Sequence, residues 1–337
     1  MSLRHVIGHR RLTALISRAI DRESLPPTLL FAGPSGVGKW RVALAAAQAL
    51  NCLEPVRDAN GLPFDACGRC RSCDRIARGV HVDVIALEPD DRASIKIDVV
   101  RDVLGRTGYR PFEGKLRVVL VREADTLEPA AQNALLKNLE EPPPGTLFIL
   151  TTAVPGVLLS TVRSRCMRLR FGRLTAAEVA SALVRDHGQS ERDAKDAAPL
   201  SDGSIGQALA LSDLDFGGLR DLAMRLLQQT AGRADTQSRL QAATSVVAGL
   251  SKKQERTDLT AVLRLAASML HDIEALNSGA DPRVLANPLL TDDLSTLAGS
   301  FAGDRARSAF GAVDRALTAL ERNAGTKVVA EWLAVQL

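Results

Sequence analysis

The chain has 337 residues, which is enough for two or three domains with well-buried cores. Apolar residues make up 46% of the chain, aromatic residues 3%, and the net charge is +4, so packing should be mainly aliphatic and contact with nucleic acid is permitted without being indicated. Because the start carries no apolar signal core and no window approaches 18 uninterrupted apolar residues, we expect neither secretion nor membrane spanning, and we expect a cytoplasmic protein.

The first predicted helix covers residues 10–20, where apolar side chains recur at helical spacing. The next segment, TLLFAGPSGVGKWRVALA, reads as a strand, a glycine-rich turn and a second helix. Its turn contains Gly33, Gly36, Gly38 and Lys39, and it fits the first seven positions of G-x-x-x-x-G-K-[ST], whose N–H groups and lysine surround nucleotide phosphates. The eighth position is Trp40, and an indole cannot ligate Mg²⁺ as a hydroxyl would. We therefore predict a phosphate loop that lacks a metal ligand, with an ordinary strand-to-helix turn as the alternative.

Residues 51–80 interrupt this pattern with turn residues and four cysteines, Cys52, Cys67, Cys70 and Cys73. In a reducing compartment the spacing C-x14-C-x2-C-x2-C indicates metal binding instead of disulfides. The insertion is too short to bury a core of its own, and a tetrahedral zinc held by four thiolates would supply the missing stability. We predict a structural zinc, with free or redox-active thiols as the alternative; four thiolates leave no open position for a catalytic zinc.

Residues 81–87 and 115–121 are predicted strands, and residues 97–104 are a predicted amphipathic helix. The strand 115–121 runs directly into Arg122 and Glu123. In nucleotide hydrolases of this architecture such a strand ends in an Asp that holds Mg²⁺, followed by a Glu that orients the attacking water. Arg122 would repel the metal, although it could meet a phosphate or a carboxylate. The alternative is that both residues are solvated charges at a strand end.

A helix over residues 130–141 should end at the prolines that follow it, because proline disfavours a continuing helix. The strand 146–151 comes next, and its polar end, Thr151 and Thr152, should lie near the phosphate loop of a doubly wound sheet.

Several motifs together resemble the clamp-loader subunits of bacterial DNA polymerase III, which are AAA+ proteins: NALLKNLEEPP, the TT after FIL, RSRC, VIGH near the start, and the four-cysteine insertion. The match covers nearly the whole chain. The resemblance implies an α/β AAA+ P-loop domain over residues 1–172 with its zinc module at 51–80, a small helical lid at 173–213 and an all-α collar at 214–337. It also implies assembly with gamma/tau motor subunits and a delta subunit in a heteropentamer, which contacts the sliding clamp and primed DNA as a whole.

Three positions depart from the ATP-hydrolysing motors of that family. Trp40 replaces the loop hydroxyl, Arg122 replaces the metal-binding Asp, and Gly206 stands where the motor lid carries an arginine. The chain therefore most resembles the family's non-hydrolysing delta-prime subunit, which implies no enzyme activity for the isolated chain and a role within the polymerase III holoenzyme. Lys39 and the loop glycines leave ATP or ADP binding open, without turnover.

The SRC motif gives Arg165 a role by resemblance: it would point at the ATP of a neighbouring motor, as an arginine finger in trans. A surface ion pair is the alternative for this side chain. The basic run from Arg163 to Arg173 permits DNA contact or contact with a partner subunit. Two further readings of the whole chain stay open: an active gamma/tau-like motor with unusual metal ligation, and a zinc-dependent nucleic-acid-binding module.

After Phe171 the chain becomes rich in Ala and Leu, which favours helices. Thr175 and Glu178 form a T-x-x-E capping box at the start of the predicted lid. From Leu219 onward we predict about five helices, the last over residues 327–337, with Trp332 in a core or a collar interface.

Overall fold

The computed structural model describes the chain in these ranges: 2–58, 62–91, 93–212, 215–231, 235–279, 281, 285–287, 290–322 and 324–337. The chain forms two compact units. The first comprises residues 1–187 and 202–206, and the second comprises residues 188–201 and 207–337.

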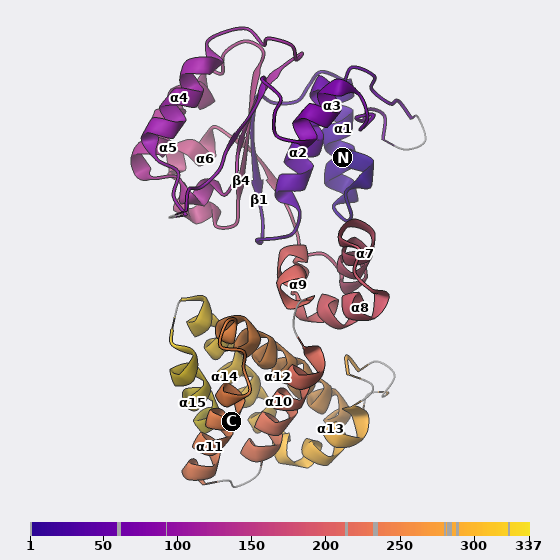
Figure 1. Cartoon of the computed structure of the whole chain (residues 1–337), viewed down its shortest axis with the longest axis vertical. Coiled ribbons are helices and arrows are strands. Elements are labelled where there is room, and N and C mark those ends of the chain that lie inside the picture. Colours follow the sequence, from indigo (N-terminus) through magenta and orange to yellow (C-terminus); the bar gives the residue numbers. More distant parts are fainter. Residues whose placement is uncertain are drawn as a thin grey trace. The chain divides into compact units, whose positions relative to one another are not determined.

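A parallel sheet of five strands organises the first unit, in the order β2-β3-β4-β1-β5 (Figure 1). Its strands are β1 (Thr28–Ala32), β2 (Val84–Leu87), β3 (Arg117–Val121), β4 (Thr146–Thr152) and β5 (Met167–Arg170). Every residue of β1, β3 and β4 is buried. These three strands read as nearly continuous apolar runs because both faces of a parallel sheet are covered.

Helices cover the two faces of this sheet (Figure 1). On one face lie α1 (Arg10–Asp21), α2 (Lys39–Asn51) and α3 (Arg71–Ala77), and on the other lie α4 (Ile97–Thr107), α5 (Pro129–Glu140) and α6 (Ser160–Ser164). Strand residues alternate between the two cores: Leu29 and Phe31 join the core under α2, whereas Leu30 joins the core under α5. Three short 3₁₀ turns complete the unit: η1 (Leu3–His5), η2 (Ala124–Thr126) and η3 (Pro155–Val157).

The predicted elements of the first unit are present with small shifts at their ends. The one clear difference is the strand predicted over residues 81–87, which begins only at Val84. The side chain of the preceding residue, Asp83, accepts hydrogen bonds from the loop at Glu113 and Gly114. This contact keeps Asp83 out of the strand, which therefore begins one residue later.

Asp83 and Arg117 form a buried ion pair at the start of β2 and β3, with 3.0 Å between Oδ1 and Nη2. The Asp83 carboxylate also accepts the N–H groups of Phe112, Glu113 and Gly114, at 2.8 to 2.9 Å. Burial would raise the pKa of Asp83, but these N–H groups and the guanidinium outweigh it and keep the pKa below its ordinary value. The pair therefore fixes the loop before β3.

Replacing Asp83 by Ala should lower the free energy of unfolding by about 3 to 5 kcal/mol, because the buried Arg117 loses its partner. Urea unfolding at neutral pH measures this. Because the folded-state pKa of Asp83 is depressed, its contribution is complete above the unfolded-state value near 3.8 and is lost as the pH falls through the folded-state value. The free energies of unfolding of wild type and variant should thus become equal at acid pH. The exposed pair of Asp102 with Arg106 is the control, and Asp102→Ala should change stability by about 0.5 kcal/mol or less; equal losses would contradict the assignment.

α7 (Ala176–His187) closes the first unit, and the predicted capping box is confirmed at its start. The Thr175 N–H donates to Glu178 Oε2 at 2.9 Å, and the Glu178 N–H donates to Thr175 Oγ1 at 3.2 Å. Two further helices, α8 (Glu191–Leu200) and α9 (Ile205–Ser212), follow in the segment predicted as the lid. The predicted end of that lid, at residues 213 and 214, lies outside the described residues.

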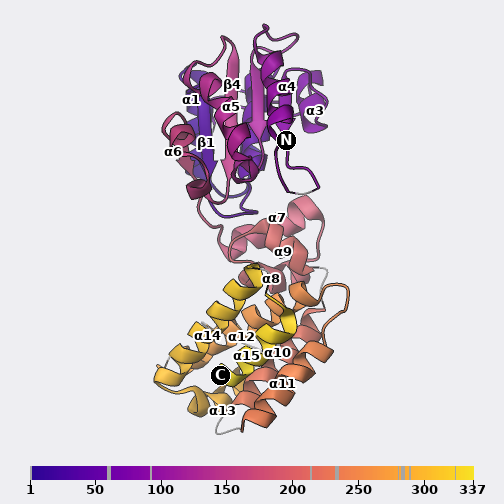
Figure 2. The same ribbon diagram turned by 90° about the vertical axis from the view of Figure 1, so that its left-hand side faces the viewer.

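Among the described residues of the second unit six α-helices follow, where about five were predicted. They are α10 (Phe216–Thr230), α11 (Thr236–Ala248), α12 (Glu255–Asn277), α13 (Thr291–Ala298), α14 (Asp304–Glu321) and α15 (Thr326–Gln336), with the turn η6 (Gly299–Phe301). α10 and α14 pack against α12, and α11 packs against α15 (Figure 2). α11 ends at Gly249, which is its C-cap residue.

Across the described ranges, no helix has both the length and the apolar composition that crossing a membrane requires.

Candidate functional site

The predicted phosphate loop lies between the end of β1 and the start of α2, as the sequence indicates. Gly36 has a φ of +71°, which disfavours other residues, and a Cβ there would lie 2.2 Å from Ser204 Oγ. A Cβ on Gly33 would lie 2.2 Å from the carbonyl oxygen of Phe171. Gly33 is therefore required by a close contact, and Gly36 by a close contact and by its backbone conformation.

Lys39 opens α2 with its side chain turned back over this loop. Its ammonium group donates to the carbonyl oxygens of Gly33 at 2.6 Å and Pro34 at 2.5 Å, and the residue is only 8% exposed. Burial lowers the pKa of Lys39, and the nearby carboxylates of Asp125 and Glu123 oppose that effect without overcoming it. The ammonium group thus contacts neutral oxygens of its own loop.

Trp40 and Arg122, the residues at the two predicted metal positions, contact each other. The Arg122 guanidinium carbon lies 5.7 Å from the centroid of the Trp40 ring, which is a cation–π contact. Nη1 of Arg122 also lies 3.1 Å from Oε2 of Glu88, and its Nε lies 3.8 Å from Oε1 of Glu123. Neither Trp40 nor Arg122 offers an oxygen ligand, so these residues do not fit a magnesium ion at this position.

The segment around Gly206 packs directly on the phosphate loop. The Gly206 N–H donates to the Gly36 carbonyl at 3.3 Å, and a Cβ on Gly206 would lie 3.2 Å from the Gly36 Cα. The position where a motor subunit would carry an arginine is thus a close contact between two glycines. This contact could not be predicted from the sequence, since Gly36 and Gly206 are far apart in the chain.

Two further contacts complete the surroundings of the loop. The Gly33 N–H donates to the carbonyl of Thr152 at 3.2 Å, which confirms that the end of β4 lies beside the loop. His9 Nε2 lies 2.8 Å from the carbonyl oxygen of Val37, and its ring meets Phe171 edge-on with 4.8 Å between centroids. No local pattern at His9 predicted this contact with the loop.

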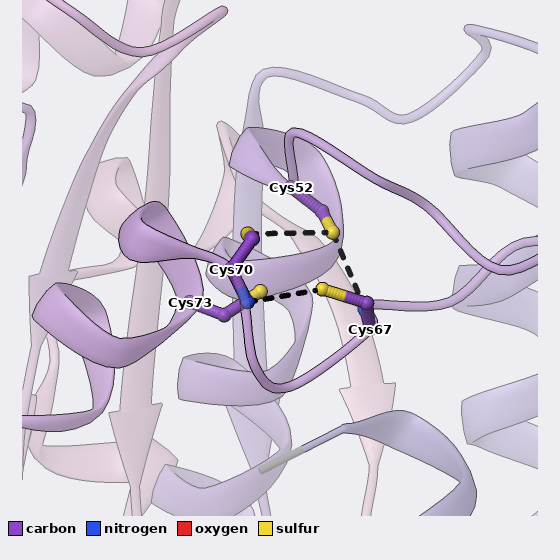
Figure 3. A group of neighbouring side chains, drawn as sticks. All are labelled: Cys52, Cys67, Cys70 and Cys73. Atoms are coloured by element: carbon purple, nitrogen blue, oxygen red, sulfur yellow. Dashed lines mark hydrogen bonds between the residues drawn. The ribbon is translucent and has the colours of Figure 1, made fainter.

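The four predicted cysteines come together at the end of α2 and the start of α3 (Figure 3). Their sulfur atoms all lie within 4.8 Å of one another, and Cys52 Sγ is 3.9 Å from Cys70 Sγ. A tetrahedral zinc with bonds of about 2.3 Å would place its sulfurs about 3.8 Å apart. Cys52, Cys70 and Cys73 are buried and Cys67 is half-buried. The donor set therefore fits a closed structural zinc, which would bind all four thiolates.

The thiols of this cluster have unequal acidities. Burial would raise the pKa of Cys70, but the N–H groups of Cys73 and Leu53 and the neighbouring sulfurs outweigh it and lower that pKa to about 6. Burial and the adjacent Cys70 raise the pKa of Cys73. The lowered pKa of Cys70 favours the thiolate form, which is the form that binds a metal cation.

The cysteine segment is attached to the rest of the unit by buried polar contacts. Asp65 accepts the N–H groups of Leu3 at 2.9 Å and Arg4 at 3.0 Å, and it is fully buried. The Ser17 hydroxyl donates to the Phe64 carbonyl at 2.7 Å and accepts the Phe64 N–H at 3.0 Å. The insertion is therefore packed against α1 and the N-terminal segment.

Arg165 lies far from the phosphate loop of its own chain. Its carbonyl accepts the Thr28 hydroxyl at 2.7 Å, so it lies beside the first residue of β1, whereas the loop follows the last. A strand of this length separates the two by roughly 15 Å. The guanidinium pairs with Glu140 Oε2 at 3.0 Å through Nη2 and donates to the Thr161 carbonyl at 3.1 Å. Its side chain is 32% exposed.

The family model and the curated relatives agree on one family. A family model described as "DNA polymerase III, delta subunit" matches residues 8–175. A DNA polymerase III subunit gamma/tau of Mycobacterium bovis is 32% identical over 293 residues, which covers 86% of this chain and 48% of the relative. The subunit tau of Escherichia coli is 32% identical over 213 residues, covering 62% of this chain and 32% of the relative.

The chain thus spans about half or less of the length of these curated relatives. Among solved structures, a DNA polymerase III gamma subunit-related protein of Thermotoga maritima matches with a TM-score of 0.49 and 16% identity, covering 96% of this chain and 97% of that one. On the family model and the curated relatives, the chain belongs to the clamp-loader family of bacterial DNA polymerase III, a family of AAA+ proteins.

Proposed function

We propose that the chain is a delta-prime-like clamp-loader subunit, which assembles with ATP-hydrolysing subunits but does not hydrolyse ATP itself. The observation that carries this proposal is the contact between Trp40 and Arg122. Two residues without metal-ligating oxygens stand at the positions where a motor holds Mg²⁺ between its loop hydroxyl and its strand-end Asp. Glu123 then has no metal-bound phosphate to act on.

Within this proposal, Arg165 contributes to the ATPase site of a neighbouring motor subunit. Its distance from its own loop and its exposed, single-carboxylate pairing support a role outside its own subunit. An exposed ion pair of this kind contributes little to stability, so the guanidinium can leave Glu140 for the more strongly charged γ-phosphate. The residue would stabilise the charge that develops there during transfer.

We propose three domains for this role: the AAA+ domain over residues 1–172 with the zinc module at 51–80, the lid at 173–213, and the collar at 214–337. The collar would bind neighbouring subunits. Exposed apolar side chains support this, among them Phe310 on α14 and, on α15, Val328 and Trp332, of which 47%, 67% and 38% are exposed. The partners would be gamma/tau motors and a delta subunit in a cytoplasmic heteropentamer, which loads the sliding clamp onto primed DNA within the polymerase III holoenzyme.

The second candidate is a gamma/tau-like motor. It is favoured by the names of the curated relatives and by the retention of Lys39 in a complete glycine framework.

ATP hydrolysis by the purified chain separates the two candidates. Single-turnover measurements with radiolabelled ATP and Mg²⁺ should give the same rate as buffer alone, because the chain offers neither metal ligand of a motor. Lys39→Ala serves as the control, and it should leave this rate unchanged. Turnover by wild type that Lys39→Ala abolishes would establish the motor and overturn the proposal.

A further inference from the structure

The phosphate loop keeps the parts that bind an anion, although it has lost those that bind a metal. Within the described part of the chain, no hydrogen bond uses the N–H groups of Gly36, Val37 or Gly38 as donors, and these precede the 13-residue helix α2. Such N–H groups at a helix N-terminus form a ready site for phosphate. Lys39 adds a buried cation whose ammonium group donates to two carbonyl oxygens of the loop. The carboxylates of Asp125 and Glu123 act on it electrostatically, but among the described residues no ion pair joins it to a carboxylate.

Arg122 stands beside this cradle and is held by contacts that are easily exchanged. The guanidinium carbon lies 5.7 Å from the centroid of the Trp40 ring, and Trp40 directly follows Lys39 on the first turn of α2. Its partners Glu88 and Glu123 have side chains that are 46% and 50% exposed, and Arg122 itself is 44% exposed. Solvent-exposed pairs of this kind are weak, so the guanidinium can transfer to a phosphate while it stays on the indole.

The net charge that Arg122 brings to the metal position equals the net charge found there in a motor. In a motor, a divalent cation and the Asp that binds it leave one net positive charge facing the phosphates. The Arg122 guanidinium supplies one positive charge without any metal, and its fork of N–H groups suits phosphate oxygens.

We propose that this loop binds the polyphosphate of a nucleotide without a divalent cation, with Arg122, positioned by Trp40, in place of the metal. The inference rests on the proposed function in one respect, namely that the same two residues prevent turnover. The ligand class is a nucleoside di- or triphosphate or the free pyrophosphate group that they share.

Isothermal titration of the full chain with ADP, ATP and pyrophosphate, each with excess Mg²⁺ and with EDTA, tests the proposal. The dissociation constant should change by less than about threefold between the two conditions, since no metal ligand contributes. Arg122→Gln should weaken binding about ten- to a hundredfold in both, the range that a charge-assisted hydrogen bond supplies. Trp40→Leu should weaken it less, and Trp40→Phe should retain most of it.

Arg106→Gln is the matched control, because Arg106 is an exposed arginine on α4 paired only with Asp102 among the side chains of its surroundings. It should leave the affinity unchanged. Tighter binding of ADP than of pyrophosphate would identify a nucleotide as the ligand, and equal binding would identify the polyphosphate alone; both support a metal-free site.

Two results would overturn the inference. If none of the three ligands binds to a chain whose thermal unfolding is normal, the loop is closed, and the proposed non-hydrolysing role still stands. If the dissociation constant is more than about tenfold lower with Mg²⁺ than with EDTA, Arg122 does not replace the metal. If that Mg²⁺-dependent binding is accompanied by hydrolysis, the proposed function fails as well.

Discussion

Replacing Arg165 by Ala should reduce ATP hydrolysis at the adjacent motor site by roughly 10³-fold or more, the lower end of what arginine fingers supply. The physical reason is the loss of a fixed positive charge at the γ-phosphate in the transition state. The reconstituted complex should contain motors whose own SRC arginine is replaced by Ala, so that only the site facing this chain keeps a finger. Steady-state ATPase then reports Arg165 alone.

Glu140→Ala provides the matched control for Arg165. It removes the same ion pair, whose Nη2 to Oε2 distance is 3.0 Å, but leaves the guanidinium in place. ATPase should be retained in this variant, and both variants should co-elute with the other subunits. If Arg165→Ala leaves ATPase unchanged, or if Glu140→Ala lowers it equally, Arg165 serves only as a surface ion pair.

Replacing Cys73 by Ser should remove zinc from the purified chain and lower the melting temperature by roughly 10 °C. The three remaining sulfurs cannot close a tetrahedral site, and loss of a structural metal is among the changes that exceed about 4 kcal/mol. Elemental analysis should give one zinc per wild-type chain, and differential scanning calorimetry measures the change in melting temperature.

Cys166→Ala is the control for this experiment. Cys166 is buried outside the cluster, and burial raises the pKa of its thiol to about 11, so it is a neutral thiol at neutral pH. This variant should keep its zinc. A wild-type chain that is purified without metal and unfolds at the same temperature with and without a chelator would contradict the zinc assignment.

The sheet could be predicted from the sequence because its central strands are buried on both faces. RVVLV and the LFIL centre of TLFILTT are unbroken or nearly unbroken apolar runs, which are typical of strands covered on both faces, as in a parallel sheet under helices. The start of β2 could not be predicted, since Asp83 is drawn into a contact with a loop about thirty positions later in the chain. The end of α11 at Gly249 could not be placed from the sequence, because the helix formers on both sides of it give no local stop signal apart from the glycine.

The site residues could be predicted where they belong to short sequence motifs. Two C-x2-C steps and a glycine-lysine loop bring their residues together through local geometry, so Cys67, Cys70 and Lys39 could be found directly. The contact between Trp40 and Arg122 joins a helix start to the end of a strand two positions away in the sheet. The periodicity of the sequence does not predict such a contact, because the contact depends on the order of the strands in the sheet.

We propose above all that Arg165 of this chain acts at the ATPase site of a neighbouring motor, while the chain's own phosphate loop hydrolyses no ATP. The most direct measurement is ATP turnover by a complex in which every motor carries Ala at its phosphate-loop lysine, so that the loop at Lys39 is the only intact one. We expect background hydrolysis from this complex, and full hydrolysis from the reverse complex that combines Lys39→Ala in this chain with wild-type motors. Turnover by the first complex, or its loss from the second, would contradict it.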